Sequence, residues 1–125
     1  MPVNDALAYV AAAMVALWGV AHVIPTRQVL AGFEPITADN RRVILQEWLA
    51  EAFTMWGVAA VVVVATVMVE GHDVTIWIYR VAAGLLVALA LLTGFTGART
   101  PVIWFKICPV LLTVSAALLV AASLV

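Results

Sequence analysis

Residues 38–69 read ADNRRVILQEWLAEAFTMWGVAAVVVVATVMV, and this stretch decides the fold class of the chain. Its apolar part runs from Ala52 to Val69, and about 20 apolar residues in helical form span the roughly 30 Å hydrocarbon core of a membrane. Lipid forms no hydrogen bonds with open backbone groups, so a helix is the economical way to cross it. We therefore predict a transmembrane helix over about residues 38–69.

Three further stretches have the same character, at about residues 6–24, 74–96 and 101–124. The chain has 125 residues, of which 66% are hydrophobic and 10% are charged. A soluble domain normally contains about a quarter charged residues, so an ordinary soluble fold is not expected. We predict a single all-α domain over residues 1–125, an integral membrane bundle of four transmembrane helices. Close helix approaches are expected at Gly57 with Ala60, Gly84 with Ala88 and Gly94 with Ala98, because small residues favour packing in lipid.

Charge and motifs exclude several classes of function. The net charge of −1 gives no reason to expect nucleic acid as a partner. Cys108 is the single cysteine, so an internal disulfide and a four-cysteine metal site are excluded. The sequence contains no phosphate-binding loop, serine nucleophile elbow or zinc-protease motif. We therefore expect neither a metal nor a cofactor.

The distribution of basic residues predicts the orientation in the membrane. Five basic residues flank one membrane side, and one flanks the other. The five are Arg27, Arg41, Arg42, Arg99 and Lys106, against Arg80. The positive-inside rule predicts that the side with five basic residues faces the cytoplasm and that both termini lie on the outer side of the cytoplasmic membrane. Membrane lipid is therefore an expected partner. A helix over residues 38–69 would measure roughly 48 Å, so its first turns are expected to extend into the cytoplasmic interface.

Polar residues gather at the start of that long helix. Asn40, Glu47, Glu51 and Thr54 are separated by seven, four and three positions and therefore share one helix face. Two carboxylates one turn apart repel each other unless a proton or a cation lies between them. An acidic residue within a spanning helix is costly by a few kcal/mol and is a functional candidate by default.

Other polar and aromatic residues fall at the same depth, on the predicted cytoplasmic side. We expect them to line one pocket in the inner leaflet, although depth does not reveal which helices face each other. The candidate acid–base residues are His22, Glu47 and Glu51, and the candidate ligand-binding residues are Trp18, Asn40, Arg42, Trp48, Thr54, Arg99 and Lys106. The structural alternatives are a hydrated Glu47, a Glu51 held in a salt bridge and a His22 that serves packing alone.

These residues favour a pocket that binds a hydrophobic or amphiphilic small molecule. If the chain is an enzyme, the natural chemistry is isomerisation, cyclisation or epoxide opening, because each needs only a positioned acid and base in a dry site. One alternative is a proton-coupled small transporter, with Glu51 as the coupling site. The other is a non-enzymatic accessory or scaffold subunit. A homo-oligomer is also consistent with a small chain that exposes much apolar surface.

Overall fold

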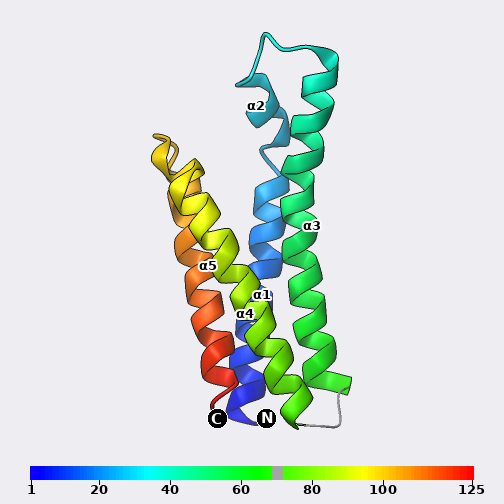
Figure 1. Cartoon of the computed structure of the whole chain (residues 1–125), viewed down its shortest axis with the longest axis vertical. Coiled ribbons are helices and arrows are strands. Elements are labelled where there is room, and N and C mark those ends of the chain that lie inside the picture. The colour runs from blue at the N-terminus through cyan, green and yellow to red at the C-terminus, as the bar shows by residue number, and fades with distance from the viewer. Residues whose placement is uncertain (69–71) are drawn as a thin grey trace.

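The computed structural model describes residues 1–68 and 72–125, and these parts are helical (Figure 1). The elements are α1 (Val3–Val23), α2 (Thr26–Ala31), α3 (Ala38–Met68), α4 (His72–Phe95), the short 3-10 helix η1 (Gly97–Arg99) and α5 (Ile103–Ala122). The long helices α1, α3, α4 and α5 are each long and apolar enough to cross a membrane. The prediction of an all-α bundle with four membrane-spanning helices is confirmed.

The predicted helix boundaries differ little from the observed ones. The largest difference is at the N-terminus, where α1 begins at Val3 rather than near residue 6. The predicted last residue of the second long helix, Val69, lies outside the described residues. Helix α2 was not predicted, because its few residues are too short to show a hydrophobic period.

Both termini lie at one end of the bundle, and α2 and η1 lie at the other (Figure 1). We call these the termini end and the loop end. Helix α1 packs against α3 and α5, and α4 packs against α5 along most of its length and against α3. The N-terminal turns of α3 extend beyond the α4–α5 hairpin and pack beside α2 (Figure 1). The helix is thus longer than the α4–α5 hairpin beside it, and the position of its first turns in the cytoplasmic interface stays a prediction.

Small side chains allow α1 and α3 to approach closely. Gly19 is buried, and a Cβ atom added there would lie 2.6 Å from Trp56 Nε1. The same indole nitrogen donates a hydrogen bond of 3.1 Å to the Ala16 carbonyl on α1. The close approach expected at Gly57 and Gly84 is wrong, since a Cβ atom at either position would meet nothing within 4 Å, whereas one at Gly94 would lie 3.8 Å from Pro109 Cβ on α5. Gly57 lines an open groove between α3 and α4, and Gly84 is exposed, which a single sequence does not reveal.

Hydrogen bonds between side chains join the helices toward the termini end. Tyr79 is fully buried, and its hydroxyl lies 2.7 Å from Thr66 Oγ1. The Thr66 hydroxyl donates to the Val62 carbonyl at 2.7 Å, so Tyr79 is the donor in the bond with Thr66. On α4, Arg80 Nε donates to Ser123 Oγ at 3.3 Å.

Replacing Tyr79 with phenylalanine is expected to lower the free energy of unfolding by about 1 kcal/mol. Phenylalanine keeps the buried ring and removes only the donor to Thr66, and such interhelical bonds contribute about 0.6 to 1.7 kcal/mol in membrane proteins. Unfolding in mixed detergent micelles, followed by circular dichroism, measures the change. An unchanged free energy of unfolding in Thr66→Val would show that this bond contributes nothing to stability.

Candidate functional site

Glu51 is a carboxyl group inside the loop end of the bundle. It lies on α3, and its side chain is 25% exposed. Its Oε2 atom is 3.8 Å from His22 Nε2 on α1, which is too long for a hydrogen bond. Its Oε1 atom is buried and has no hydrogen-bond partner among the described residues. The structure thus holds a carboxyl group inside the bundle whose buried oxygen has no hydrogen bond to a described residue.

His22 is fixed by Trp48. Its Nε2 atom lies 2.9 Å from the Trp48 carbonyl oxygen, and the two rings stack with centroids 3.8 Å apart. A carbonyl oxygen only accepts hydrogen bonds, so Nε2 carries the hydrogen and donates it. The Trp48 indole in turn donates to Thr26 Oγ1 at 3.1 Å, which ties α3 to the start of α2. His22 therefore directs its Nε2–H at the backbone of α3 and keeps Nδ1 for any other contact.

Helix α5 contributes two further side chains next to these residues, Phe105 and Cys108. Phe105 meets Trp48 edge to face, with centroids 6.1 Å apart. The buried Cys108 thiol lies beside the Trp18 indole and Thr93. Trp18 Nε1 is buried and has no hydrogen-bond partner among the described residues. We call Trp18, His22, Trp48, Glu51 and Cys108 the loop-end cluster.

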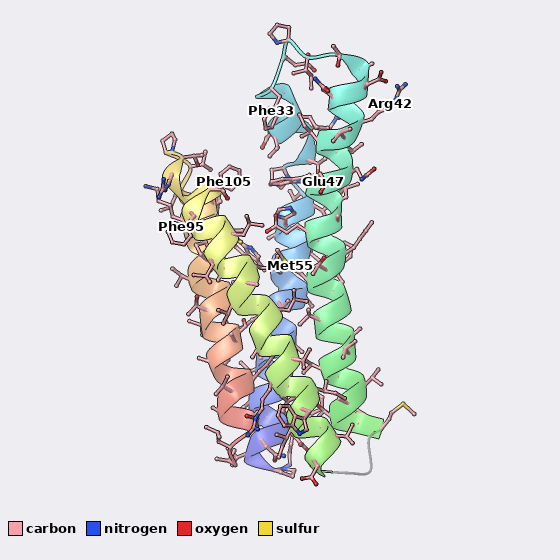
Figure 2. All side chains as sticks on the ribbon, in the orientation of Figure 1. Phe33, Arg42, Glu47, Met55, Phe95 and Phe105 are labelled. Carbon is pink, nitrogen blue, oxygen red and sulfur yellow. The ribbon has the colours of Figure 1, made fainter. Side chains whose placement is uncertain are left out.

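Three predicted site residues are exposed on the N-terminal part of α3. Figure 2 shows Arg42 on the turns that project beyond the α4–α5 hairpin and Glu47 at the level of Phe105. Arg42 pairs with Asp39 at 2.8 Å, and the exposed Glu47 accepts a bond of 3.2 Å from Gln46. The backbone amide of the exposed Asn40 donates to Thr37 Oγ1 at 3.2 Å, an arrangement that caps the helix.

The two basic residues predicted from other helices also remain outside the cluster. Arg99 is exposed and lies 5.9 Å from the centre of the Phe95 ring. Lys106 is exposed at the start of α5. The structure therefore brings together Trp18, His22, Trp48 and Glu51 of the predicted set. The sequence analysis did not assign Phe105, Cys108 or Thr26 to the site. The only sequence signal that could have found them is their position at the same predicted depth in the membrane as His22 and Glu51.

An apolar groove runs between α3 and α4, with a volume of about 510 Å³. Its walls are residues of α3 from Thr54 to Val61 and residues of α4 from Val74 to Leu85. Glu51, Thr54, Val58 and Val61 follow one another at intervals of three and four, so they form one stripe along α3. Glu51 is consequently one helical turn beyond the Thr54 end of the groove.

A second apolar groove, of about 600 Å³, lies between α1 and α3 and is lined by residues such as Tyr9 and Trp56. Neither groove includes His22, Glu47 or Glu51. Some of the residues expected to line one pocket thus form a polar cluster, and the two open apolar grooves lie outside that cluster. Thr54, which donates to the Ala50 carbonyl at 2.8 Å, belongs to the groove wall.

Within residues 1–68 and 72–125, no group of three histidine, cysteine or acidic side chains is placed to hold a metal ion. The loop-end cluster offers one carboxyl group, one oriented imidazole, the unpaired indole N–H of Trp18 and one thiol. In comparisons with known proteins, no family model, no curated protein and no solved structure matches this chain significantly.

Proposed function

We propose that this small membrane protein binds an amphiphilic molecule, with its polar head at the loop-end cluster and its apolar part in the α3–α4 groove. The observation that carries the proposal is the Glu51 carboxyl group, which is buried at one oxygen and has no hydrogen bond to a described residue. An unsatisfied buried polar group costs about 1 to 3 kcal/mol, and more when it is charged. A bound head group that donates a hydrogen bond to Glu51 offsets this cost.

A purely structural salt bridge explains the Glu51 environment less well. The only basic side chain near the carboxyl group, within the described part of the chain, is His22 at 3.8 Å. The Nε2–H of His22 is already directed at the Trp48 carbonyl. A pair at this distance leaves the carboxyl oxygens without hydrogen bonds, and buried ion pairs are stable only when their remaining polar atoms are satisfied.

The groove gives the apolar part of the molecule a place next to this head group. Its walls are almost entirely apolar, and its volume falls in the range of about 300 to 1,000 Å³ that is usual for ligand sites. The rise from Glu51 to Val61 along α3 is about 15 Å. A single alkyl chain lying along this stripe would extend from the cluster toward the middle of the membrane.

Acid–base chemistry on the bound molecule is a further part of the proposal, and Glu51 is its proton donor or acceptor. Isomerisation, cyclisation and epoxide opening require a group of this kind in a dry site. His22 contributes orientation, since its Nε2–H is held by Trp48. Glu47 is exposed on α3 and accepts a bond from Gln46, so we assign it no direct contact with the ligand.

Proton-coupled transport receives less support from the same residues. The buried residues of α3 between Glu51 and Thr66 are Ala52, Met55, Val58, Ala59, Val62 and Ala65. These side chains carry no titratable group. A proton that reached Glu51 from the loop end would therefore meet an apolar barrier along α3.

We also propose that the loop end faces the cytoplasm. Arg27 lies in α2, Arg41 and Arg42 lie on the projecting part of α3, and Arg99 and Lys106 lie at the turn before α5 and its start. These positions collect the basic residues at one end, which is the distribution that the positive-inside rule associates with the cytoplasmic side.

Native mass spectrometry of protein released from mild detergent tests the binding proposal. We expect a small-molecule mass that remains bound to the unaltered protein and is lost in Glu51→Gln. Glu47→Gln is the matched control, because it removes a carboxylate of the same helix outside the cluster, and it should keep the bound mass. Variable amounts of bulk lipid that are equal in all three proteins would contradict the proposal.

A further inference from the structure

The first turns of α4, at the termini end, carry two opposite charges on one face. Asp73, Trp77 and Arg80 follow one another at intervals of four and three positions, so they form one stripe along the helix, and all three are exposed. We infer that this stripe binds the head group of a phospholipid with a primary ammonium, phosphatidylethanolamine, with the phosphate at Arg80 and the ammonium at Asp73. The site lies at the opposite end of the bundle from the loop-end cluster and is independent of the proposed function.

The Arg80 guanidinium is held from two sides. Its Nε atom donates to the hydroxyl of Ser123, the residue that follows α5, at 3.3 Å. Ser123 is 4% exposed, and its hydroxyl donates to the Val120 carbonyl, so it accepts the bond from Arg80. The guanidinium carbon also lies 5.3 Å from the centre of the Trp77 ring. These contacts bring the charged group toward the termini end, where α5 ends (Figure 1).

The two terminal nitrogens of Arg80 are left for an anion. Within residues 1–68 and 72–125, the carboxylates that lie within 4 Å of a basic side chain pair with His22, Arg41 and Arg42, and none pairs with Arg80. Arginine presents its N–H groups in a fork that matches two oxygens of a phosphate. A basic side chain near the end of a spanning helix reaches the lipid head groups, which stabilise its charge.

Asp73 determines which phospholipid fits. It lies in the first turn of α4, two turns and about 10 Å before Arg80 along the helix axis. The Arg80 side chain leans back toward it, because helical side chains point toward the helix N-terminus. A primary ammonium, joined to the phosphate by a two-carbon linker, donates hydrogen bonds to this carboxylate. The quaternary ammonium of phosphatidylcholine donates none, and the net negative charge of phosphatidylglycerol is repelled by Asp73.

The same face of α4 offers a track for an acyl chain. Gly84 and Ala88 continue the stripe at intervals of four positions, and both are exposed. A Cβ atom at Gly84 would meet nothing within 4 Å, so a chain can approach the helix backbone there. Along α4 from the termini end, the helix therefore presents a carboxylate, a guanidinium and a small apolar surface. This is the order in which phosphatidylethanolamine presents its ammonium, its phosphate and its acyl chain.

Photochemical capture of the lipid on this track tests the inference. Photoreactive benzoylphenylalanine replaces Ala88, and the protein is placed in nanodiscs that contain equal amounts of phosphatidylethanolamine, phosphatidylcholine and phosphatidylglycerol with identical acyl chains. The mass of the crosslinked product identifies the lipid. We expect the adduct with phosphatidylethanolamine to be favoured about fivefold over each of the others. This factor corresponds to about 1 kcal/mol, which is the size of a favourable exposed charge pair. The same photoreactive residue at the exposed Val114 of α5 should capture the three lipids equally.

Two substitutions assign the preference to the two charges. Asp73→Asn keeps the phosphate contact and should remove the preference for phosphatidylethanolamine over phosphatidylcholine. Arg80→Gln should return all three adducts to equal amounts. Asp39→Asn and Arg42→Gln are the matched controls, since these residues form an exposed charge pair on α3, and neither should change the adducts at position 88. Far-UV circular dichroism establishes that each variant is folded.

The adducts in the protein with unaltered charges decide the outcome. Equal capture of the three lipids at position 88 would overturn the inference, and Arg80 would then contact the head groups of any phospholipid. Enrichment of phosphatidylglycerol would also overturn it, because Asp73 would have no part in selection. Glu51→Gln should leave the adducts unchanged, so this result and the test of the proposed function are read separately.

Discussion

Replacing Gly19 with alanine is expected to lower the free energy of unfolding by about 2 kcal/mol. The added Cβ atom would lie 2.6 Å from Trp56 Nε1 and 2.9 Å from Cδ1, so the indole has to move. Movement of the ring breaks its hydrogen bond to the Ala16 carbonyl and separates α1 from α3. Inserting atoms into a packed interior typically costs about 1 to 3 kcal/mol.

Gly57→Ala is the matched control for this effect. A Cβ atom at Gly57 meets nothing within 4 Å, so this substitution keeps the same change in helix propensity without a clash. Unfolding of both variants in mixed micelles measures the difference. The double variant Gly19→Ala, Trp56→Leu should be less destabilised than the sum of the two single variants, and equal stability of Gly19→Ala and Gly57→Ala would contradict the packing described at Gly19.

Replacing Trp48 with alanine is expected to lower the free energy of unfolding by about 3 kcal/mol and to abolish ligand binding. Trp48 stacks on His22, meets Phe105 edge to face and donates to Thr26. Its removal leaves a cavity where α1, α2, α3 and α5 meet, and truncation of a packed tryptophan typically costs about 3 to 5 kcal/mol. The His22 ring then loses the surface that orients it toward Glu51.

Trp104→Ala separates this effect from the general loss of an interfacial tryptophan. Trp104 is 64% exposed near the start of α5, so its truncation should change stability little. Chemical unfolding gives the stabilities, and native mass spectrometry of the two proteins gives the retained small molecule. Equal behaviour of the two variants would show that Trp48 does not organise the loop-end cluster.

The four long helices could be predicted from the sequence because a membrane imposes strict requirements on length and polarity. The run from Ala52 to Val69 satisfies both requirements, and the three other apolar stretches do so as well. The membrane places no comparable requirement on which faces of the helices contact each other. The sequence therefore indicated Gly57 and Gly84 as contact points, whereas the tight contact lies at Gly19.

The sequence predicted at which level of the bundle the candidate site residues lie, but it predicted less well in which directions their side chains point. His22 and Glu51 were expected at the same level, and their side chains do approach to 3.8 Å. Arg42 and Glu47 share a helix with Glu51, but Arg42 lies on the turns of α3 that project beyond the α4–α5 hairpin, and Glu47 is exposed at the level of Phe105 (Figure 2). Contacts such as the bond between His22 and the Trp48 carbonyl depend on how α1 and α3 are rotated, which the sequence pattern does not specify.

The most direct test of ligand binding at Glu51 is photochemical crosslinking from the groove in living membranes. Photoreactive benzoylphenylalanine is placed at Val61, which lines the α3–α4 groove, or at the exposed Val67, which lines neither groove. We predict one dominant small-molecule adduct at position 61, lost in Glu51→Gln and kept in Glu47→Gln, and mixed bulk lipid at position 67. The same mixture of lipids at both positions, unchanged by Glu51→Gln, would contradict the account.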